Sequence, residues 1–167
     1  MMPRLLAAAV ALTLALPGQA AAAGLLSQLV GRTFVIPDAQ ARPTPMEFVA
    51  PEKDVVEVRI AGQLIDRYRV GAGGGEHVNV TAPDLISTAS FGPDAWSRTY
   101  KGLTTTYSLN EEGDLVARLS GSVEAWQRPR FVYGHNPAHP DLDRRLRSAL
   151  EEAHEEADRY EGHDHEH

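Results

Sequence analysis

The sequence predicts an all-β protein, either a small meander β-barrel or a two-layer sandwich, with a C-terminal amphipathic helix and a disordered tail. Between Leu29 and Tyr133, short runs of β-branched and aromatic residues alternate with glycine and proline about every 8 to 12 residues, a spacing typical of all-β folds. Tight-turn sequences join neighbouring runs, and after Tyr133 the apolar residues change to helical spacing. These observations predict a β-barrel-like domain at 24–138, a helix at 139–161 and a tail at 162–167.

Alternation of side chains along the chain identifies the strands. Val56, Val58 and Ile60 lie on one face of an extended segment, and Leu103 and Tyr107 share a face of another. The expected strands are 29–36, 46–50, 55–61, 63–70, 77–81, 85–90, 95–101, 103–109, 115–120 and 122–127.

The connections between these strands indicate their order. Gly62, Gly113 and Gly121 lie in short connections and can take the positive φ of tight hairpins. Sequential hairpins form a meander, and so many strands would expose long edges unless the sheet closes, which favours a barrel. A sandwich would need long crossovers, for which 37–45 and 71–75 are the available segments.

One acidic residue interrupts an expected apolar face. Asp66 lies between Leu64 and Tyr68 on the same side of its strand. A polar group there suits a barrel interior that holds water or a ligand, whereas a register shift of one residue would place it outside.

The N-terminus has the order of segments of a cleavable secretion signal at 1–23. Arg4 precedes an apolar run at 5–16, which is shorter than the roughly 20 residues of a membrane span. Small residues follow, so cleavage is expected between Ala21 and Gly24. We therefore expect a periplasmic or secreted protein with no transmembrane segment after cleavage. The chain has no cysteine, which excludes disulfides and thiolate metal sites.

The charge of the chain argues against nucleic acid as a partner. The net charge is −7, and the segment 141–167 carries 10 acidic and 4 basic residues. The β domain has scattered arginines but no basic stripe, so we expect no nucleic-acid binding.

An apolar stripe follows the predicted helix. Its members are Leu142, Leu146, Ala149, Leu150, Ala153, Ala157 and Tyr160. Such a stripe needs a partner surface. The helix could dock onto the barrel, or it could use Leu142, Leu146, Leu150 and Tyr160 to contact a second copy or another protein.

The C-terminus concentrates groups that bind metals. His163, His165 and His167 alternate with acidic residues, and His154 and Asp158 share one helical face. Imidazole and carboxylate ligands suit Zn²⁺, with Ni²⁺ or Cu²⁺ as alternatives. The other interpretation is a solvated tail that binds metals weakly.

No catalytic motif stands out. A metalloprotease helix would need a second histidine where Asp158 stands, and His135 and His139 are interpreted as polar loop surface. The order of short strands broadly resembles the ligand-carrying β-barrels of the lipocalin type, although no motif at specific positions assigns the chain to that family. We therefore expect an exported, soluble, non-enzymatic binding protein for a small ligand or partner, with a metal-binding C-terminus. The alternative is an envelope interaction module or inhibitor that uses the helix stripe.

Overall fold

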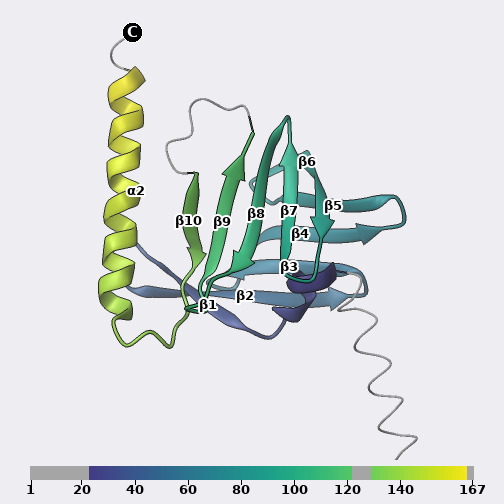
Figure 1. The fold of residues 1–167 in the computed structure, drawn as a ribbon, viewed down its shortest axis with the longest axis horizontal. Helices are drawn as coiled ribbons and strands as arrows, with labels where there is room; N and C mark the ends of the chain where they lie inside the picture. Colours follow the sequence, from purple (N-terminus) through teal and green to yellow (C-terminus); the bar gives the residue numbers. More distant parts are fainter. Residues whose placement is uncertain (1–22, 122–128, 165–167) are drawn as a thin grey trace, which may run out of the picture.

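The computed structural model describes residues 23–121 and 129–164, and within them the chain forms a ten-stranded antiparallel sheet in sequential order (Figure 1). The strands are β1 (Thr33–Pro37), β2 (Pro43–Glu52), β3 (Val55–Ile60), β4 (Gln63–Gly71), β5 (Gly74–Asn79), β6 (Ala82–Phe91), β7 (Ala95–Tyr100), β8 (Leu103–Leu109), β9 (Leu115–Ser120) and β10 (Arg130–Gly134). A helix, α2 (Leu142–Asp164), follows the last strand. The predicted all-β meander with a C-terminal helix is confirmed.

The sheet curls until its first and last strands nearly meet. Val35 of β1 and His135, just after β10, form an isolated antiparallel bridge with N···O distances of 2.9 and 2.8 Å. The sheet is therefore nearly closed into a barrel, and α2 lies beside β10 and contacts β1 (Figure 1). The bridge and the helix protect the strand edges at this seam from pairing with another chain.

Local turn chemistry sets the meander order. Ala61 and Gly62 have φ values of 52° and 80°, which a two-residue hairpin with a primed turn requires, and Gly113 has a φ of 83°. The segment 37–45 is also a hairpin, because the Asp38 carboxylate accepts backbone hydrogen bonds within the turn. The segment 71–75 likewise belongs to a hairpin between β4 and β5. Neither segment forms the crossover that a sandwich would need.

The sequence-based boundaries were wrong at the first strand. Residues 23–28 are helical and β1 begins only at Thr33, because Leu26 and Leu29 are buried together in the core. The expected strand at 122–127 lies outside the described residues. The strand that pairs with β9 is β10 (Arg130–Gly134), which the turn pattern did not reveal.

One end of the barrel is filled by apolar side chains. Leu26, Leu29, Phe34, Met46 and Phe48 are at most 2% exposed and belong to one cluster. The helical segment 23–28 is fixed there by a 2.8 Å hydrogen bond from the Leu25 N–H to the Gly92 carbonyl. A Cβ on Gly24 would lie 2.1 Å from that carbonyl oxygen, so the close approach requires glycine.

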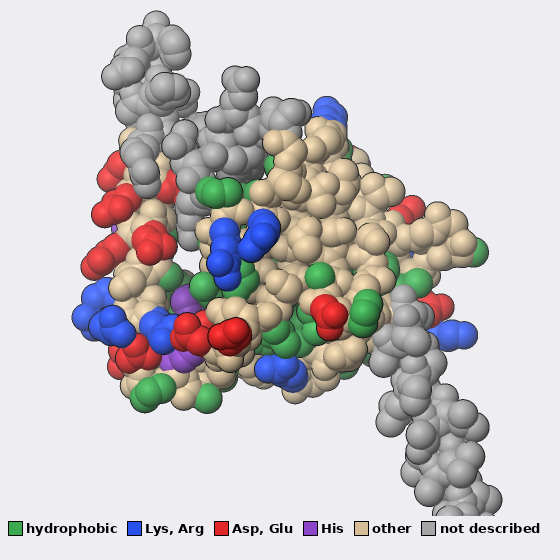
Figure 2. Space-filling model, viewed as in Figure 1, with side chains coloured by type: hydrophobic (Ala, Val, Ile, Leu, Met, Phe, Trp, Pro, Cys, Tyr) green, Lys and Arg blue, Asp and Glu red, His purple; other side chains and the backbone are tan. Residues whose placement is uncertain are grey.

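The start of α2 docks onto the barrel. Leu146 is fully buried, Leu142, Ala149 and Leu150 are partly buried, and Ala153 is exposed. Docking is therefore observed for the first turns, and Leu146 is already covered by the chain itself. Figure 2 shows acidic and basic side chains along the outer surface of this helix.

None of the helical segments in the described part of the chain combines the length and apolarity needed to cross a membrane. The predicted signal peptide at 1–23 lies almost wholly outside the described residues and stays a prediction. Cleavage between Ala21 and Gly24 would leave Leu25, Leu26 and Leu29 in the mature chain, where they complete the core.

We predict that Leu29→Ala lowers the free energy of unfolding by about 2 to 5 kcal/mol, because it leaves a cavity in the filled end. Val30→Ala is the matched control, since the neighbouring Val30 is 37% exposed. Urea unfolding followed by tryptophan fluorescence measures both variants. Equal losses of stability in the two variants would contradict the burial of Leu29 in the core.

Candidate functional site

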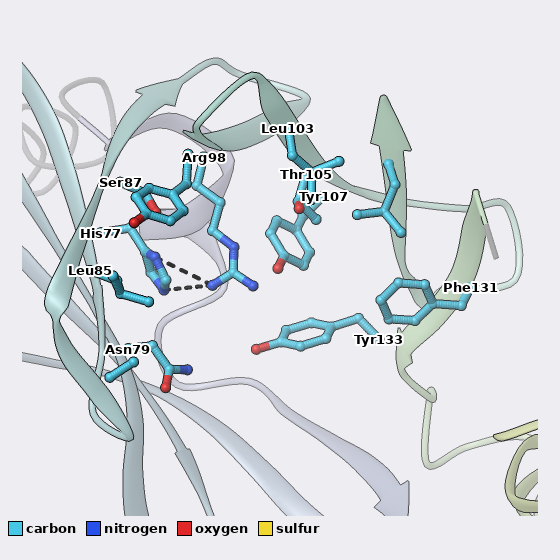
Figure 3. Close-up of a pocket in the computed structure, with 13 residues that line it drawn as sticks. His77, Asn79, Leu85, Ser87, Arg98, Leu103, Thr105, Tyr107, Phe131 and Tyr133 are labelled. Carbon is cyan, nitrogen blue, oxygen red and sulfur yellow. Dashed lines mark hydrogen bonds between the residues drawn. The ribbon is translucent and has the colours of Figure 1, made fainter. Parts of the chain in front are cut away.

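A cavity of about 380 Å³ opens in the part of the barrel that the apolar cluster leaves unfilled (Figure 3). Side chains from β5 to β10 form its walls. They are His77, Asn79, Ala82, Leu85, Ser87, Arg98, Tyr100, Leu103, Thr105, Tyr107, Leu119, Phe131 and Tyr133. Alternation along β7 and β8 turns Arg98, Thr105 and Tyr107 inward, whereas Ser97 and Thr106 lie on the other face.

A buried carboxylate lies behind the polar wall of this cavity. Asp66 is 2% exposed, and its Oδ1 accepts hydrogen bonds from Asn79 Nδ2 at 3.0 Å and Arg98 Nη1 at 3.3 Å. The Tyr133 hydroxyl donates to Oδ2 at 3.0 Å. These partners come from β5, β7 and β10. The carboxylate therefore links β4 to its neighbour β5 and, across the interior, to β7 and β10. Of the two placements that the sequence left open for Asp66, the structure shows the interior one.

His77 lies between Asp66 and Arg98. Its Nε2 is 2.7 Å from Asp66 Oδ1 and 2.6 Å from Arg98 Nη1, so it donates to the carboxylate or accepts from the guanidinium according to its tautomer. Burial alone would raise the pKa of Asp66, but the hydrogen bond from His77 and the positive charge of Arg98 outweigh it and lower the pKa. Asp66 is therefore an anion that holds a cation beside it.

Arg98 presents the remaining part of its guanidinium to the cavity. Among the described residues, every side-chain hydrogen bond of Arg98 runs through Nη1. Its Nη2 and Nε donors thus have no partner there, and its Cζ lies 5.6 Å from the centre of the Tyr107 ring. In Figure 3 the guanidinium extends between His77 on one side and Tyr107 and Tyr133 on the other.

Aromatic rings separate the cavity from the filled end. Trp96 stacks on Tyr107 with ring centres 4.8 Å apart, and Tyr107 contacts Tyr133 at the same distance. Burial raises the pKa of Tyr107 to about 12 and raises that of Tyr133 well above its usual value. Both hydroxyls therefore remain protonated, and that of Tyr133 donates to Asp66.

The sequence analysis missed His77 and Arg98. Arg98 lies on the inward face of β7 together with Trp96 and Tyr100, and His77 lies on the same face of β5 as Asn79. Alternation could thus have placed them inside, but it does not tell which strands face each other across the barrel. Arg98 lies 32 residues from Asp66 in the sequence, and His77 lies 11 residues from it.

The predicted C-terminal metal site lies partly outside the described residues. His154 and Asp158 are exposed on α2. The structure does not describe the side chain of His163, and it does not describe His165 or His167. That metal site stays a prediction.

The described residues bring a different set of metal-competent groups together: Glu112, Asp114 and His139. The interpretation of His135 and His139 as polar loop surface was wrong, because His135 is 5% exposed and the His139 side chain is 9% exposed. Both are covered where the loop after β10 packs between the hairpin at 110–114 and α2.

Comparisons of the chain with protein-family models, with curated proteins and with solved structures find no match. The functional inference accordingly rests on the geometry of the cavity and of the residues around it.

We predict that Asp66→Asn lowers the free energy of unfolding at neutral pH by about 3 to 5 kcal/mol, because Arg98 loses its buried counter-charge. The folded-state pKa of Asp66 is below its ordinary value of 3.8, so its stabilisation is complete above that value and is lost as the pH falls through the folded pKa. The variant should lack this acid-side loss.

Urea unfolding at neutral pH and at acidic pH measures both effects. Asp84→Asn is the control, because Asp84 is exposed and its substitution should leave stability unchanged. A neutral-pH stability of Asp66→Asn equal to that of the control would contradict the network.

Proposed function

We propose that this protein is a non-enzymatic binding protein that holds a small ligand with an acidic group and an apolar body inside the barrel. One observation carries the proposal: Arg98 lines a cavity of about 380 Å³, and its Nη2 and Nε donors have no partner among the described residues. Ligand pockets commonly have volumes of about 300 to 1,000 Å³, so the cavity suits a small molecule.

The arrangement of charges favours an acidic ligand group. Asp66 is behind the wall and is not among the lining residues, whereas Arg98 is a lining residue with 26% of its side chain exposed. A ligand therefore meets the guanidinium first. A carboxylate or sulfonate would receive charge-assisted hydrogen bonds from Arg98 in a site partly shielded from water.

The rest of the wall suits an apolar body. Leu85, Leu103, Leu119 and Phe131 line the cavity, and the Tyr107 ring closes one side of it. A ligand with an aliphatic or aromatic portion would cover these side chains and gain about 25 cal/mol for each Å² of apolar surface removed from water.

Binding explains the polar groups better than catalysis does. The Tyr107 and Tyr133 hydroxyls keep their protons, and the Asp66 carboxylate already accepts hydrogen bonds from several strands. These groups are suited to orienting a ligand rather than to exchanging protons with it. We further propose that the protein acts after export, to the periplasm or outside the cell, because of the signal-like segment 1–23.

The proposed location of the ligand can be tested with the fluorescent anion 1-anilinonaphthalene-8-sulfonate. Titration should show saturable fluorescence enhancement with the full chain. Thr105→Phe fills the cavity and should weaken binding at least about tenfold, equivalent to about 1.4 kcal/mol. Thr106→Phe, on the opposite face of β8, should bind within about twofold of the unchanged protein. Equal affinities of the two variants would place the probe elsewhere.

The proposed charge preference has its own test. N-phenyl-1-naphthylamine is the same probe without the sulfonate, and the double variant Asp66→Asn/Arg98→Gln removes both charges without leaving either unpaired. The double variant should lose about tenfold or more in affinity for the anionic probe, since a hydrogen bond to a charged group contributes about 1.5 to 3 kcal/mol. Its affinity for the neutral probe should change little. Parallel losses for both probes would show that Arg98 does not select the acid.

A further inference from the structure

A second polar cluster lies outside the barrel interior, near the N-terminal end of α2. Glu112 and Asp114 belong to the hairpin between β8 and β9, and His139 belongs to the loop before the helix. One ligand atom from each of the three lies within 4.8 Å of the other two. Figure 2 shows histidine, acidic and basic side chains gathered at this end of the helix.

His135 supplies an independent sign that this region binds a ligand. It is 5% exposed, and among the described residues neither of its ring nitrogens has a hydrogen-bond partner. Buried polar groups in native proteins nearly always have a hydrogen-bond partner. A buried group without one indicates a water molecule or an ion at that place. The imidazole therefore has a nitrogen lone pair that no described residue uses.

The orientation of His135 brings it toward the cluster. A Cβ on the preceding Gly134 would meet Phe34, so Gly134 faces the core, and alternation turns His135 to the side of α2. There it lines a cavity of about 340 Å³ together with Arg145, whose Nη2 lies 2.8 Å from Glu112 Oε2. His135 and the three-residue cluster thus share one region.

We propose that Glu112, Asp114 and His139 bind a divalent transition-metal ion of the Zn²⁺ type, next to the unpartnered imidazole of His135. Carboxylate oxygen and imidazole nitrogen are usual Zn²⁺ ligands, at about 2.0 to 2.2 Å from the ion. The chain has no thiolate to offer, and this oxygen and nitrogen set is the one that suits Zn²⁺, Ni²⁺ or Cu²⁺.

The present contacts show what the ion would replace. His139 Nε2 donates a hydrogen bond to Asp114 Oδ1 at 2.7 Å, and Arg145 Nη2 lies 2.8 Å from Glu112 Oε2. An ion would take the place of the proton in that hydrogen bond and displace the guanidinium. Arg145 would keep its 2.9 Å contact with Asp141, so it would not lose its charge partner. The backbone N–H of Asn136 donates to Asp114 at 2.8 Å and helps to fix the carboxylate.

The site would stabilise the seam of the barrel. It joins the β8–β9 hairpin to the loop that contains His135, whose backbone forms the bridge to Val35. An ion bound to the folded state alone raises stability in proportion to RT ln(1 + [L]/Kd), so binding should raise the melting temperature. This site is separate from the barrel cavity, and it uses none of the histidines of the tail.

The test is Zn²⁺ affinity of the full chain, measured by competition with a chromophoric chelator, together with the melting temperature with and without Zn²⁺. Glu112→Gln and His139→Gln should each weaken the site about tenfold or more and reduce the thermal shift. Glu112 has a 54% exposed side chain, so its variant should fold even if His139→Gln does not. The triple variant His163→Gln/His165→Gln/His167→Gln should keep both the site and the thermal shift.

Arg145→Gln distinguishes a metal site from a purely structural contact. It removes the cation that competes for Glu112, so it should strengthen Zn²⁺ binding several-fold. Unchanged affinity in Glu112→Gln and His139→Gln, loss of all binding in the tail variant, or no gain in Arg145→Gln would overturn the proposal.

Discussion

The carboxylate of Asp66 is buried inside the barrel and accepts hydrogen bonds from side chains of β5, β7 and β10. An ionised carboxylate in such a place is costly unless it is paired, so the side chains around it must keep their positions. Tyr133 comes from the last strand and Asp66 from the fourth, so their hydrogen bond spans the interior. The same contact that satisfies the charge therefore also fixes β10 relative to β4, next to the seam where the barrel is nearly closed.

This constraint divides the interior into two parts. Leu26, Leu29 and Phe34 fill one end, and the stacked rings of Trp96 and Tyr107 separate it from the cavity. On the cavity side, Asp66 holds Arg98 by one nitrogen and leaves its other donors facing the open space. The buried carboxylate thus stabilises the fold and also positions the cation that would recognise an acidic ligand.

The sequence was informative where short-range chemistry decides the structure. Ala61–Gly62 and Gly113 specify hairpins through their backbone conformations, and the alternation around Asp66 put it on the same face as Leu64 and Tyr68. The helical segment 23–28 was missed because its burial depends on contacts with Phe34 and Phe48, which a local pattern does not contain. The same limit applies to the sites. Arg98 is 32 residues from Asp66 and His139 is 25 from Asp114. The curvature of the sheet brings the first pair together, and the pairing of β9 with β10 brings the second pair together.

The central claim is that Asp66 holds Arg98 in place to receive an acidic ligand group inside the barrel. A crystal structure of the full chain with bound 1-anilinonaphthalene-8-sulfonate tests it most directly. We expect the sulfonate at about 3 Å from Arg98 Nη2 or Nε, with the Asp66–Arg98 contact kept and the rings against Leu103 and Phe131. A probe bound outside the barrel, or one inside it with the sulfonate turned away from Arg98, would contradict the claim.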